Sequence, residues 1–466
     1  MISTIPKTHF FLPEDLHTYE LPQIFSVSTA WIEFGMDKRI ATFDLIIRDM
    51  PPHRNFLLSC GIEEIILGIL KWKYTSKEIK SLLRNETITP KFAEYLKKFR
   101  FTGDVSAIPE GTIFFPGEPI VRITAPIIEA NILSMFLLNT ICGNVKYLSK
   151  IVRCVHAANP KPCYGVAGLR ADSFESAMKC ARASYIAGSI GANLVHSFAN
   201  KFNLPLSNVM VIAYHAYIKS FPSELEAMRK ISILYKGKIN LMVDTYEFEQ
   251  GMRNAIKVAK ELEEKGWQLA GITIDSGNLF ERAVRAKARL ISANLHYIKI
   301  TITGNLDEYK IKEYMDKKIP ADSFIIATEA ITVPDSPKIE SVYKLAELRD
   351  NGNIRYCAKF SPGKESYPGR KQVFRTCKNK IMAKDIIGLE DEQLGEPLLI
   401  EVIKNGKLGY KLPNLNQIKE HIQSQIRILP KELLDINKQH KYKVETSRKL
   451  QNLFHQVKKD HCNNEV

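Results

Sequence analysis

Three apolar segments in the middle of the chain each end in residues that could do chemistry. The residues that follow segments 239–243, 270–274 and 297–302 are Asp244, then Asp275, Ser276 and Gly277, then Thr303 and Gly304. Carboxylates at such positions bind Mg²⁺ or sugar hydroxyls, and glycine N–H groups at a helix start hold phosphate. Each polar residue could instead cap the next helix. Two acidic residues and two glycines at successive segment ends favour a binding site.

A histidine and a basic segment extend this set. His215 follows an apolar stretch and therefore also lies at a segment end. A lone histidine is more often structural than catalytic, but at the mouth of a barrel the two interpretations are about equally supported. Residues 359–375 are rich in glycine and proline and carry five basic residues. This segment is either an exposed hairpin or a clamp for an anionic substrate.

The elements that must position these residues alternate between helix and strand. Short apolar strands are predicted at 209–212, 239–243, 270–274, 297–302 and 323–326, and helices at 173–190, 223–235, 247–265, 278–292 and 306–318. This alternation indicates parallel βαβ units, and the even spacing favours a barrel at least as strongly as an open sheet. In a barrel, catalytic groups lie at the C-terminal ends of the strands, where the candidates at the segment ends fall.

The flanking regions have a different pattern. Residues 1–125 mix a strand at 40–48 and a helix at 61–70 with helical periodicity at 77–99 and hairpins at 105–124. Pro126 is predicted to open a long amphipathic helix from 127 to about 155, because proline is favoured at the first helical position. A chain of 466 residues corresponds to two or three domains, unless one large barrel takes up the difference.

The charge balance is strongly basic, with 66 Lys and Arg against 51 Asp and Glu and a net charge of +15. Clustered cations would favour a nucleic-acid partner. The basic residues are not strongly clustered, and no zinc-finger, basic-leucine or aromatic RNA-binding pattern accompanies them. We therefore expect no nucleic-acid partner. The excess charge is a solvated surface or attracts small polyphosphate substrates.

Cysteine use and hydropathy indicate a cytoplasmic protein. The eight cysteines include no C-x-x-C pair and no zinc-ligand spacing, which is typical of reduced thiols. The first fifteen residues lack a basic segment followed by a long apolar run, so no signal peptide is predicted. Residues 120–145 are the most apolar, but polar residues interrupt them. No segment reaches about 18 uninterrupted apolar residues, and we expect no membrane partner.

Six motifs in register resemble the nicotinate phosphoribosyltransferase family. They are EGT with FPGEP at 110–119, VDTY at 243–246, DSGNL at 275–279, GNLDE at 304–308, VYKL at 342–345 followed by the basic segment 359–375, and EPLL through LP at 396–413. His215 lies in AYHAYIKSF, where the family has AHSF-like residues. The matches run in order from about residue 24 to 455, which is nearly the whole chain.

The resemblance implies a type II phosphoribosyltransferase with an irregular α/β barrel. It implies an N-terminal α+β domain at 1–125, the catalytic barrel at 126–345, and a C-terminal segment at 346–466 that packs back on the N-terminal domain. Such enzymes are usually dimers with shared active sites. They join nicotinate to 5-phosphoribosyl 1-pyrophosphate, giving nicotinate mononucleotide and pyrophosphate in NAD salvage. Mg²⁺ is required, and ATP hydrolysis is coupled through a phosphorylated histidine.

The resemblance also assigns roles to individual residues. It makes His215 the phosphorylated histidine and Asp275 the ligand of the ribose hydroxyls. Tyr164 would stack on the pyridine ring, and Arg170 would meet the nicotinate carboxylate. The other substrate-binding candidates are Asp244, Ser276, Gly277 and Gly304, with Lys359, Ser361, Lys364 and Arg375 on phosphate oxygens. The motifs assign no metal ligand.

Departures from the family pattern mark a divergent member. Thr273 replaces an arginine, Val211 and Ile212 replace a Gly-Thr pair, and 325–328 replace a glycine-rich phosphate loop. Side chains in place of glycine obstruct the approach of backbone N–H groups to phosphate. We therefore expect an active transferase with a rate below the family norm. The alternatives are a pseudoenzyme that keeps the fold for binding or regulation, and a related transferase with another acceptor base.

Overall fold

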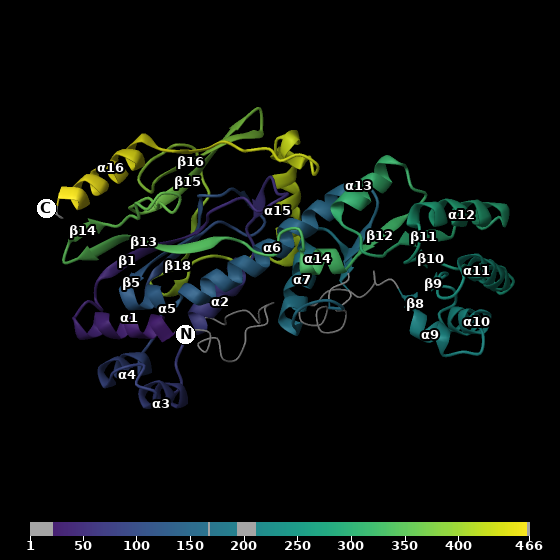
Figure 1. Ribbon diagram of the computed structural model, residues 1–466, viewed down its shortest axis with the longest axis horizontal. Coiled ribbons are helices and arrows are strands. Elements are labelled where there is room, and N and C mark those ends of the chain that lie inside the picture. Colours follow the sequence, from purple (N-terminus) through teal and green to yellow (C-terminus); the bar gives the residue numbers. More distant parts are fainter. Residues whose placement is uncertain (1–21, 166–167, 193–210, 464–466) are drawn as a thin grey trace. The chain divides into compact units, whose positions relative to one another are not determined.

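The computed structural model describes residues 22–165, 168–192 and 211–463, with backbone only at 191–192 and 462–463 (Figure 1). Contacts between residues divide the chain into two compact units. Unit 1 comprises residues 1–149 and 335–466, and unit 2 comprises residues 150–334. The three-part division predicted at residues 125 and 345 stays a prediction. The first fifteen residues, considered above for a signal peptide, lie outside the described residues.

Unit 2 is built on a sheet of parallel strands. These are β6 Cys163–Gly165, β7 Ile190–Ala192, β8 Ile212–Ala213, β9 Asn240–Met242, β10 Gly271–Ile274, β11 Lys299–Ile302 and β12 Ser323–Ile326. Their order is β7-β6-β12-β11-β10-β9-β8, and each neighbouring pair is parallel. Among the described residues the sheet ends at β7 and β8, so it forms part of a barrel. The predicted α/β fold with a barrel-like parallel sheet is confirmed.

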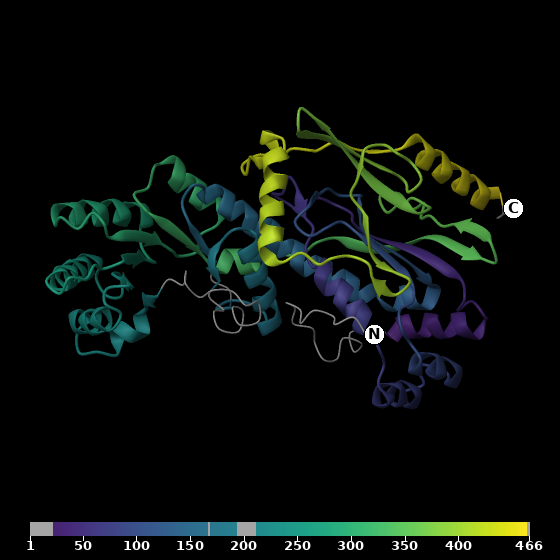
Figure 2. The ribbon, with the colours of Figure 1, turned by 180° about the vertical axis from the view of Figure 1, so that it is seen from behind.

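Helices follow these strands in the sequence, and all but the last of them, α14, lead to another strand of the sheet (Figures 1 and 2). They are α7 Phe174–Ile186, α9 His215–Lys219, α10 Glu224–Leu234, α11 Phe248–Glu263, α12 Leu279–Ser292, α13 Glu308–Asp316 and α14 Thr328–Thr332. Asn278 and Asp307 accept backbone N–H bonds at the starts of α12 and α13, as the capping interpretation predicted. The helix predicted to reach residue 190 ends at Ile186, because Gly188 takes a left-handed conformation, with φ of +100°. Residues 209–210 of one predicted strand lie outside the described residues.

Unit 1 contains a seven-stranded antiparallel sheet assembled from distant parts of the chain. Its order is β14 Asn353–Tyr356, β13 Ser341–Asp350, β1 Ile40–Ile47, β5 Pro119–Pro126, β3 Asp104–Ala107, β18 Ile400–Lys404 and β19 Lys407–Leu408. Ile40 pairs with Pro126 on one side and with Arg349 on the other. A second sheet comprises β17 Glu396–Pro397, β15 Lys371–Lys378, β16 Ile381–Leu389 and β20 Val444–Thr446. The short strands β2 Leu57–Leu58 and β4 Ile113–Phe114 pair separately.

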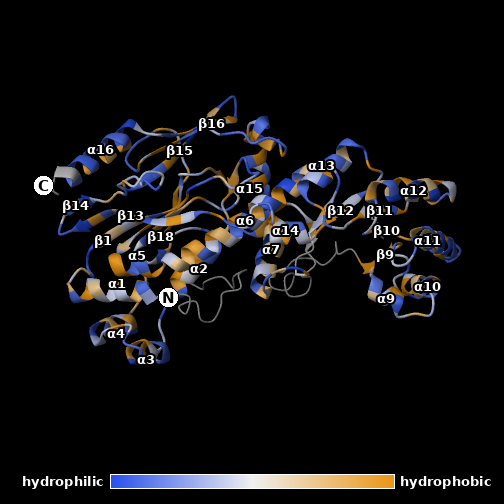
Figure 3. Ribbon diagram, in the orientation of Figure 1, coloured by the Kyte–Doolittle hydropathy of each residue, from blue (hydrophilic) through white to orange (hydrophobic). Residues whose placement is uncertain are grey.

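The remaining helices pack on these sheets or on one another, and α6 continues from unit 1 into unit 2. They are α1 Pro22–Glu33, α2 Ile62–Lys71, α3 Ser76–Arg84, α4 Pro90–Lys97, α5 Ile127–Ile132, α6 Ser134–Ala158, α15 Leu415–Ile428 and α16 Arg448–Asn463, with a short 3-10 helix at Lys431–Leu434. Helix α5 packs against β1 and β5, and α16 packs against β16. Figure 3 shows more hydrophobic residues in α2 and α5 than in α16. The charged outer helix faces solvent, whereas α2 and α5 supply the core.

The long helix predicted from 127 to about 155 is interrupted once. It forms α5 and α6, with Leu133 between them. Within the described residues this stretch, Ile127–Ala158, is long and apolar enough to cross a membrane, but 67% of its most apolar window is buried inside the protein. Burial of that kind is typical of a core helix in a globular fold, where apolar side chains pack against other elements.

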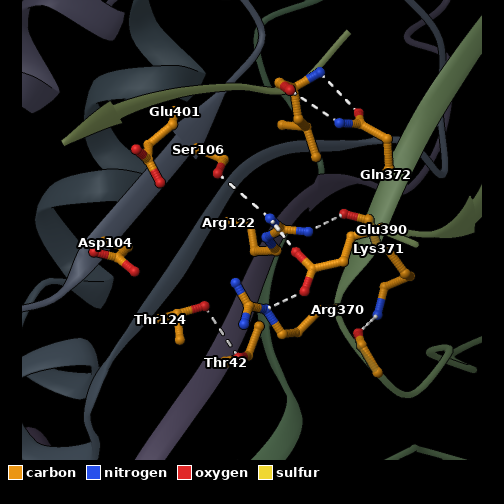
Figure 4. Close-up of polar contacts among 12 residues, drawn as sticks. Thr42, Asp104, Ser106, Arg122, Thr124, Arg370, Lys371, Gln372, Glu390 and Glu401 are labelled. Atoms are coloured by element: carbon orange, nitrogen blue, oxygen red, sulfur yellow. Dashed lines mark hydrogen bonds and ion pairs between the residues drawn. The ribbon is translucent and has the colours of Figure 1, made fainter. Parts of the chain in front are cut away.

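A network of charged side chains joins the large sheet of unit 1 to the start of β15 (Figure 4). Arg122 on β5 donates to the Lys371 carbonyl at 2.7 Å and pairs with Glu390 at 2.8 Å. Glu390 also pairs with Arg370 at 2.9 Å. The Lys371 ammonium lies 2.7 Å from the Asp44 carboxylate and donates to two backbone carbonyls. The network fixes where the basic loop that precedes β15 ends.

The interpretation of residues 359–375 as one loop is wrong in its last part. The chain enters β15 at Lys371, and Arg375 is a buried strand residue, 4% exposed. Its guanidinium donates to both oxygens of Asp385, at 2.9 and 2.5 Å, and to the Ile113 carbonyl. Asp385 lies opposite it on β16 and supplies the counter-charge that makes burial of an arginine tolerable.

Candidate functional site

The carboxyl ends of the parallel strands in unit 2 surround a cavity of about 1020 Å³. Its lining comes from the ends of β8 to β12, from the residues directly after them, and from 168–170. The apolar lining includes the side chains of Ile212, Met242 and Ile325. Polar lining residues are Arg170, Thr273, Asp275, Ser276, Thr303, Asn305, Lys310 and Thr328. An apolar cleft with a few convergent polar groups is the usual form of a small-molecule site.

His215 and Asp275 meet beside this cavity. His215 is the first residue of α9, directly after β8, and Asp275 follows β10. The His215 Nε2 atom lies 3.6 Å from Asp275 Oδ2, and its Nδ1 atom lies 3.0 Å from the Thr245 hydroxyl. Both side chains are more than a third exposed, at 37% and 39%. Their predicted placement at one end of the sheet is confirmed.

Asp244 holds the turn that carries Asp275. Its side chain is fully buried, and its Oδ2 atom accepts bonds from the backbone N–H groups of Asp275 and Ser276 and from the Ser276 hydroxyl, each at 2.8 Å. Arg282 donates to the Ser276 carbonyl from the other side of the turn. A carboxylate that holds three donors of one turn fixes the direction in which Asp275 points.

Gly304 allows two adjacent turns to approach closely. It takes a φ of +102°, and a Cβ atom there would lie 2.2 Å from the Asp275 carbonyl oxygen. Any larger residue would push apart the turns that follow β10 and β11. Gly277, with φ of +74°, lines the same cavity. The glycines therefore shape the site through the backbone, independently of any contact with phosphate.

The predicted residues of unit 2 fall into three groups. Arg170, Asp275, Ser276, Gly277 and Gly304 line the cavity. His215 and Asp244 contact that group without lining the cavity. Tyr164 lies on β6 and is half-buried, which raises the pKa of its hydroxyl, and it is not a lining residue in the described part of the chain.

The basic residues of unit 1 form a separate cationic cluster. Lys359, Ser361 and Lys364 are exposed in the loop before β15. Burial lowers the pKa of the nearby Lys344 ammonium, and the positive charges of Lys359, Arg48 and Lys364 lower it further. Neighbouring cations that repel one another favour anion binding. Arg375 does not belong to this cluster, since Asp385 and the Ile113 carbonyl occupy its donors.

Tyr214 and Lys310 are among the cavity-lining residues that sequence reasoning missed. Tyr214 directly precedes His215, and Lys310 is the third residue of α13, with its ammonium 3.0 Å from the Asn305 carbonyl. Their positions could have indicated them, because each lies close to a strand end at which another site residue was predicted. Propensity and periodicity describe helices and strands and say little about individual side chains in these turns.

The solved structure of human nicotinic acid phosphoribosyltransferase has the same fold. It matches with a TM-score of 0.81 and 20% identity over 94% of this chain and 99% of that one. The N- and C-terminal domain models of nicotinate phosphoribosyltransferase match residues 24–142 and 394–454. The two domain models cover the N-terminal and C-terminal parts of unit 1. The solved structure shows that nearly the whole chain has the phosphoribosyltransferase fold.

Curated relatives extend the similarity through both units. Nicotinate phosphoribosyltransferase pncB2 of Mycobacterium tuberculosis is 33% identical over 395 residues, covering 84% of this chain and 83% of the relative. The nicotinate phosphoribosyltransferase of Bacillus subtilis is 28% identical over 461 residues, covering 93% and 92%. The chain belongs to the nicotinate phosphoribosyltransferase family, as its motifs predicted, and is an enzyme of this type.

Proposed function

We propose that the protein joins nicotinate to 5-phosphoribosyl 1-pyrophosphate in NAD salvage, giving nicotinate mononucleotide and pyrophosphate. The observation that carries this proposal is the His215–Asp275 pair beside the cavity of unit 2 in a chain of this family. We further propose that ATP hydrolysis is coupled to the reaction, that the enzyme is a homodimer, and that it works in the cytoplasm. The seven described cysteines carry free thiols, in keeping with a reducing compartment.

The bond changes explain why a fixed carboxylate is useful here. The pyridine nitrogen attacks C1 of the ribose while the bond from C1 to the pyrophosphate oxygen breaks, and the bonding electrons leave with pyrophosphate. Positive charge develops on the sugar ring, where Asp275 binds the hydroxyls and opposes that charge. Arg170 pairs with the nicotinate carboxylate. One preorganised group of this kind contributes about 3 kcal/mol to the transition state.

The arrangement around His215 suits phosphoryl transfer. In the coupled step an imidazole nitrogen attacks the γ-phosphorus of ATP, the bond to the bridging oxygen breaks, and ADP leaves. Water later hydrolyses the phosphohistidine. The Thr245 hydroxyl holds Nδ1 at 3.0 Å, whereas the Asp275 carboxylate lies 3.6 Å from Nε2, beyond hydrogen-bond distance. A hydrogen bond to one ring nitrogen selects the tautomer and ring orientation of a catalytic histidine.

The donor set also fits Mg²⁺ that arrives with the substrate. Within residues 22–165, 168–192 and 211–463, no three His, Cys, Asp or Glu side chains form a group that could hold a metal ion. Mg²⁺ needs no such cage, because one or two carboxylates and the substrate phosphates commonly hold it. Asp275 offers an exposed carboxylate at the cavity. Bound there, Mg²⁺ would neutralise charge on the pyrophosphate.

The chain departs from the family pattern at residues that would affect phosphate binding and catalytic rate. We propose that Lys359, Ser361 and Lys364 hold phosphate oxygens, supported by the cationic cluster around Lys344. Thr273 supplies no positive charge at the cavity, and Ile325 and Ala327 line it where the family has glycines. Each lost transition-state contact costs about 3 kcal/mol, or roughly a hundredfold in rate. We therefore expect turnover below the family norm.

The test compares product formation by the wild type, His215→Ala and Asp275→Ala, with and without ATP. We expect Asp275→Ala to lose about a hundredfold or more under both conditions. His215→Ala should lose chiefly the stimulation by ATP. Assays with nicotinate, nicotinamide and quinolinate identify the acceptor. Equal background rates in all three proteins would contradict the proposal and identify a pseudoenzyme, and preference for another base would identify a related transferase.

A further inference from the structure

Tyr214 places a large, exposed aromatic side chain at the cavity. It follows β8, precedes His215 and lines the cavity with 63% of its surface exposed. Leu169, which is 71% exposed, lines the same cavity. Exposed apolar side chains that gather in a concave site mark a place where a ligand covers them.

The remaining lining residues narrow the kind of ligand face that Tyr214 can meet. Ile212 and Met242 belong to the apolar lining, whereas Asp275 and Ser276 offer oxygen atoms that suit sugar hydroxyls. A planar heterocycle offers a flat apolar face to an aromatic ring, whereas a ribose or a phosphate does not. Arg170 lines the same cavity and could pair with an acidic substituent on that ring. The chemistry around Tyr214 therefore matches a planar aromatic carboxylate.

Tyr214 departs from the motif that the sequence resembles. That motif has AHSF-like residues, so the resemblance puts an alanine where this sequence has Tyr214. The resemblance assigned the stacking contact with the pyridine ring to Tyr164. This residue is half-buried on β6 and, within the described residues, does not line the cavity. Alanine has no ring to stack, so a contact made by Tyr214 would be an added determinant of specificity.

We propose that Tyr214 is a specificity-determining residue that stacks on the pyridine ring of the acceptor base. The inference rests on the proposed transferase function and deepens it. One aromatic stacking contact is worth about three- to tenfold in affinity. The contact forms before the chemical step and persists through it, so it lowers the KM for nicotinate more than it raises kcat.

Tyr246 provides a matched control. It also follows a strand of the same sheet, is 62% exposed, and does not line the cavity within the described residues. Steady-state kinetics of Tyr214→Ala, Tyr214→Phe and Tyr246→Ala separate a stacking contact from a general surface effect. We expect Tyr214→Ala to raise the KM for nicotinate about three- to tenfold, with little change in kcat or in the KM for phosphoribosyl pyrophosphate. Tyr214→Phe and Tyr246→Ala should resemble the wild type.

Inhibition by ring analogues adds a second measurement, which would not change if Tyr214 had only a structural role. Pyridine-3-carboxylate analogues that cannot react should lose affinity in Tyr214→Ala, whereas the saturated piperidine-3-carboxylate should bind both proteins equally. An unchanged KM for nicotinate in Tyr214→Ala, or equal losses in Tyr246→Ala, would overturn the stacking proposal while leaving the transferase function intact. A wild type that forms no product with nicotinate would overturn the transferase function, and the stacking proposal with it.

Discussion

The charged residues of unit 1 are held differently from those at the strand ends of unit 2. Asp44 and Lys371 are buried, at 1% and 2% exposure, and their charged atoms are 2.7 Å apart (Figure 4 shows the surrounding network). His215 and Asp275 are more than a third exposed and 3.6 Å apart. Buried charges with a counter-charge at short distance maintain a fold once formed, whereas exposed and loosely paired ones remain available to a substrate. We therefore test the buried pair for its effect on stability and the exposed pair for its effect on catalysis.

The largest effect should come from breaking the buried pair. Asp44→Ala leaves the Lys371 ammonium without its counter-charge, and we expect unit 1 to lose about 3–5 kcal/mol of unfolding free energy. Urea denaturation followed by circular dichroism measures the loss. The double variant Asp44→Ala with Lys371→Met removes both charges and should recover most of it. A loss below about 1 kcal/mol in the single variant would contradict the assignment of this pair to stability.

Asp244 should show an intermediate effect, because it is buried like Asp44 but supports the catalytic turn. Asp244→Ala removes the acceptor of three hydrogen bonds, so we expect a loss of about 2 kcal/mol in stability together with slower product formation. Asp275→Ala should slow product formation without a comparable loss of stability. Asp244→Asn keeps an acceptor oxygen and serves as the control. Full activity in Asp244→Ala would show that the turn holds Asp275 without it.

The smallest effect should be the pH dependence that Glu118 confers on unit 1. Burial and the nearby Asp385 carboxylate raise the pKa of Glu118 well above its ordinary value of 4.5, although Arg375 opposes the shift. Above about pH 4.5 the unfolded chain releases this proton while the folded chain keeps it, so stability falls as pH rises toward the folded pKa. Glu118→Gln cannot ionise and should therefore gain stability relative to the wild type as pH rises.

Urea midpoints of the wild type and Glu118→Gln at pH 5 and pH 8 measure this difference. The gain should be larger at pH 8 than at pH 5. Glu396→Gln is the control, because Glu396 is exposed on β17, which pairs with β15. This variant should show no such trend. A gain that shrinks with rising pH would mean that Glu118 is ionised in the folded protein.

Local patterns predicted the strands and helices of unit 2 well, but they could not predict which charges would be buried. Strands β9 to β12 are apolar runs with polar ends, so composition alone locates them and places Asp275 at the cavity. The burial of Arg375 depends on Asp385 across a hairpin, and that of Asp244 depends on the turn after the next strand. Strand β6 has three residues, too few to give a period. Contacts between distant residues decided each of these cases.

The pairing of β1 has a consequence for how the chain is made. Ile40 pairs with Pro126 on β5, but its partner on the other side is Arg349 on β13, which follows the whole of unit 2 in the sequence. A ribosome delivers the chain from its N-terminus, so all of residues 150–334 are synthesised before β13 exists. Throughout that interval one edge of β1 lacks its final partner, and an open strand edge can pair with other chains. The whole of unit 2 is therefore synthesised while unit 1 still lacks the pairing of β1 with β13.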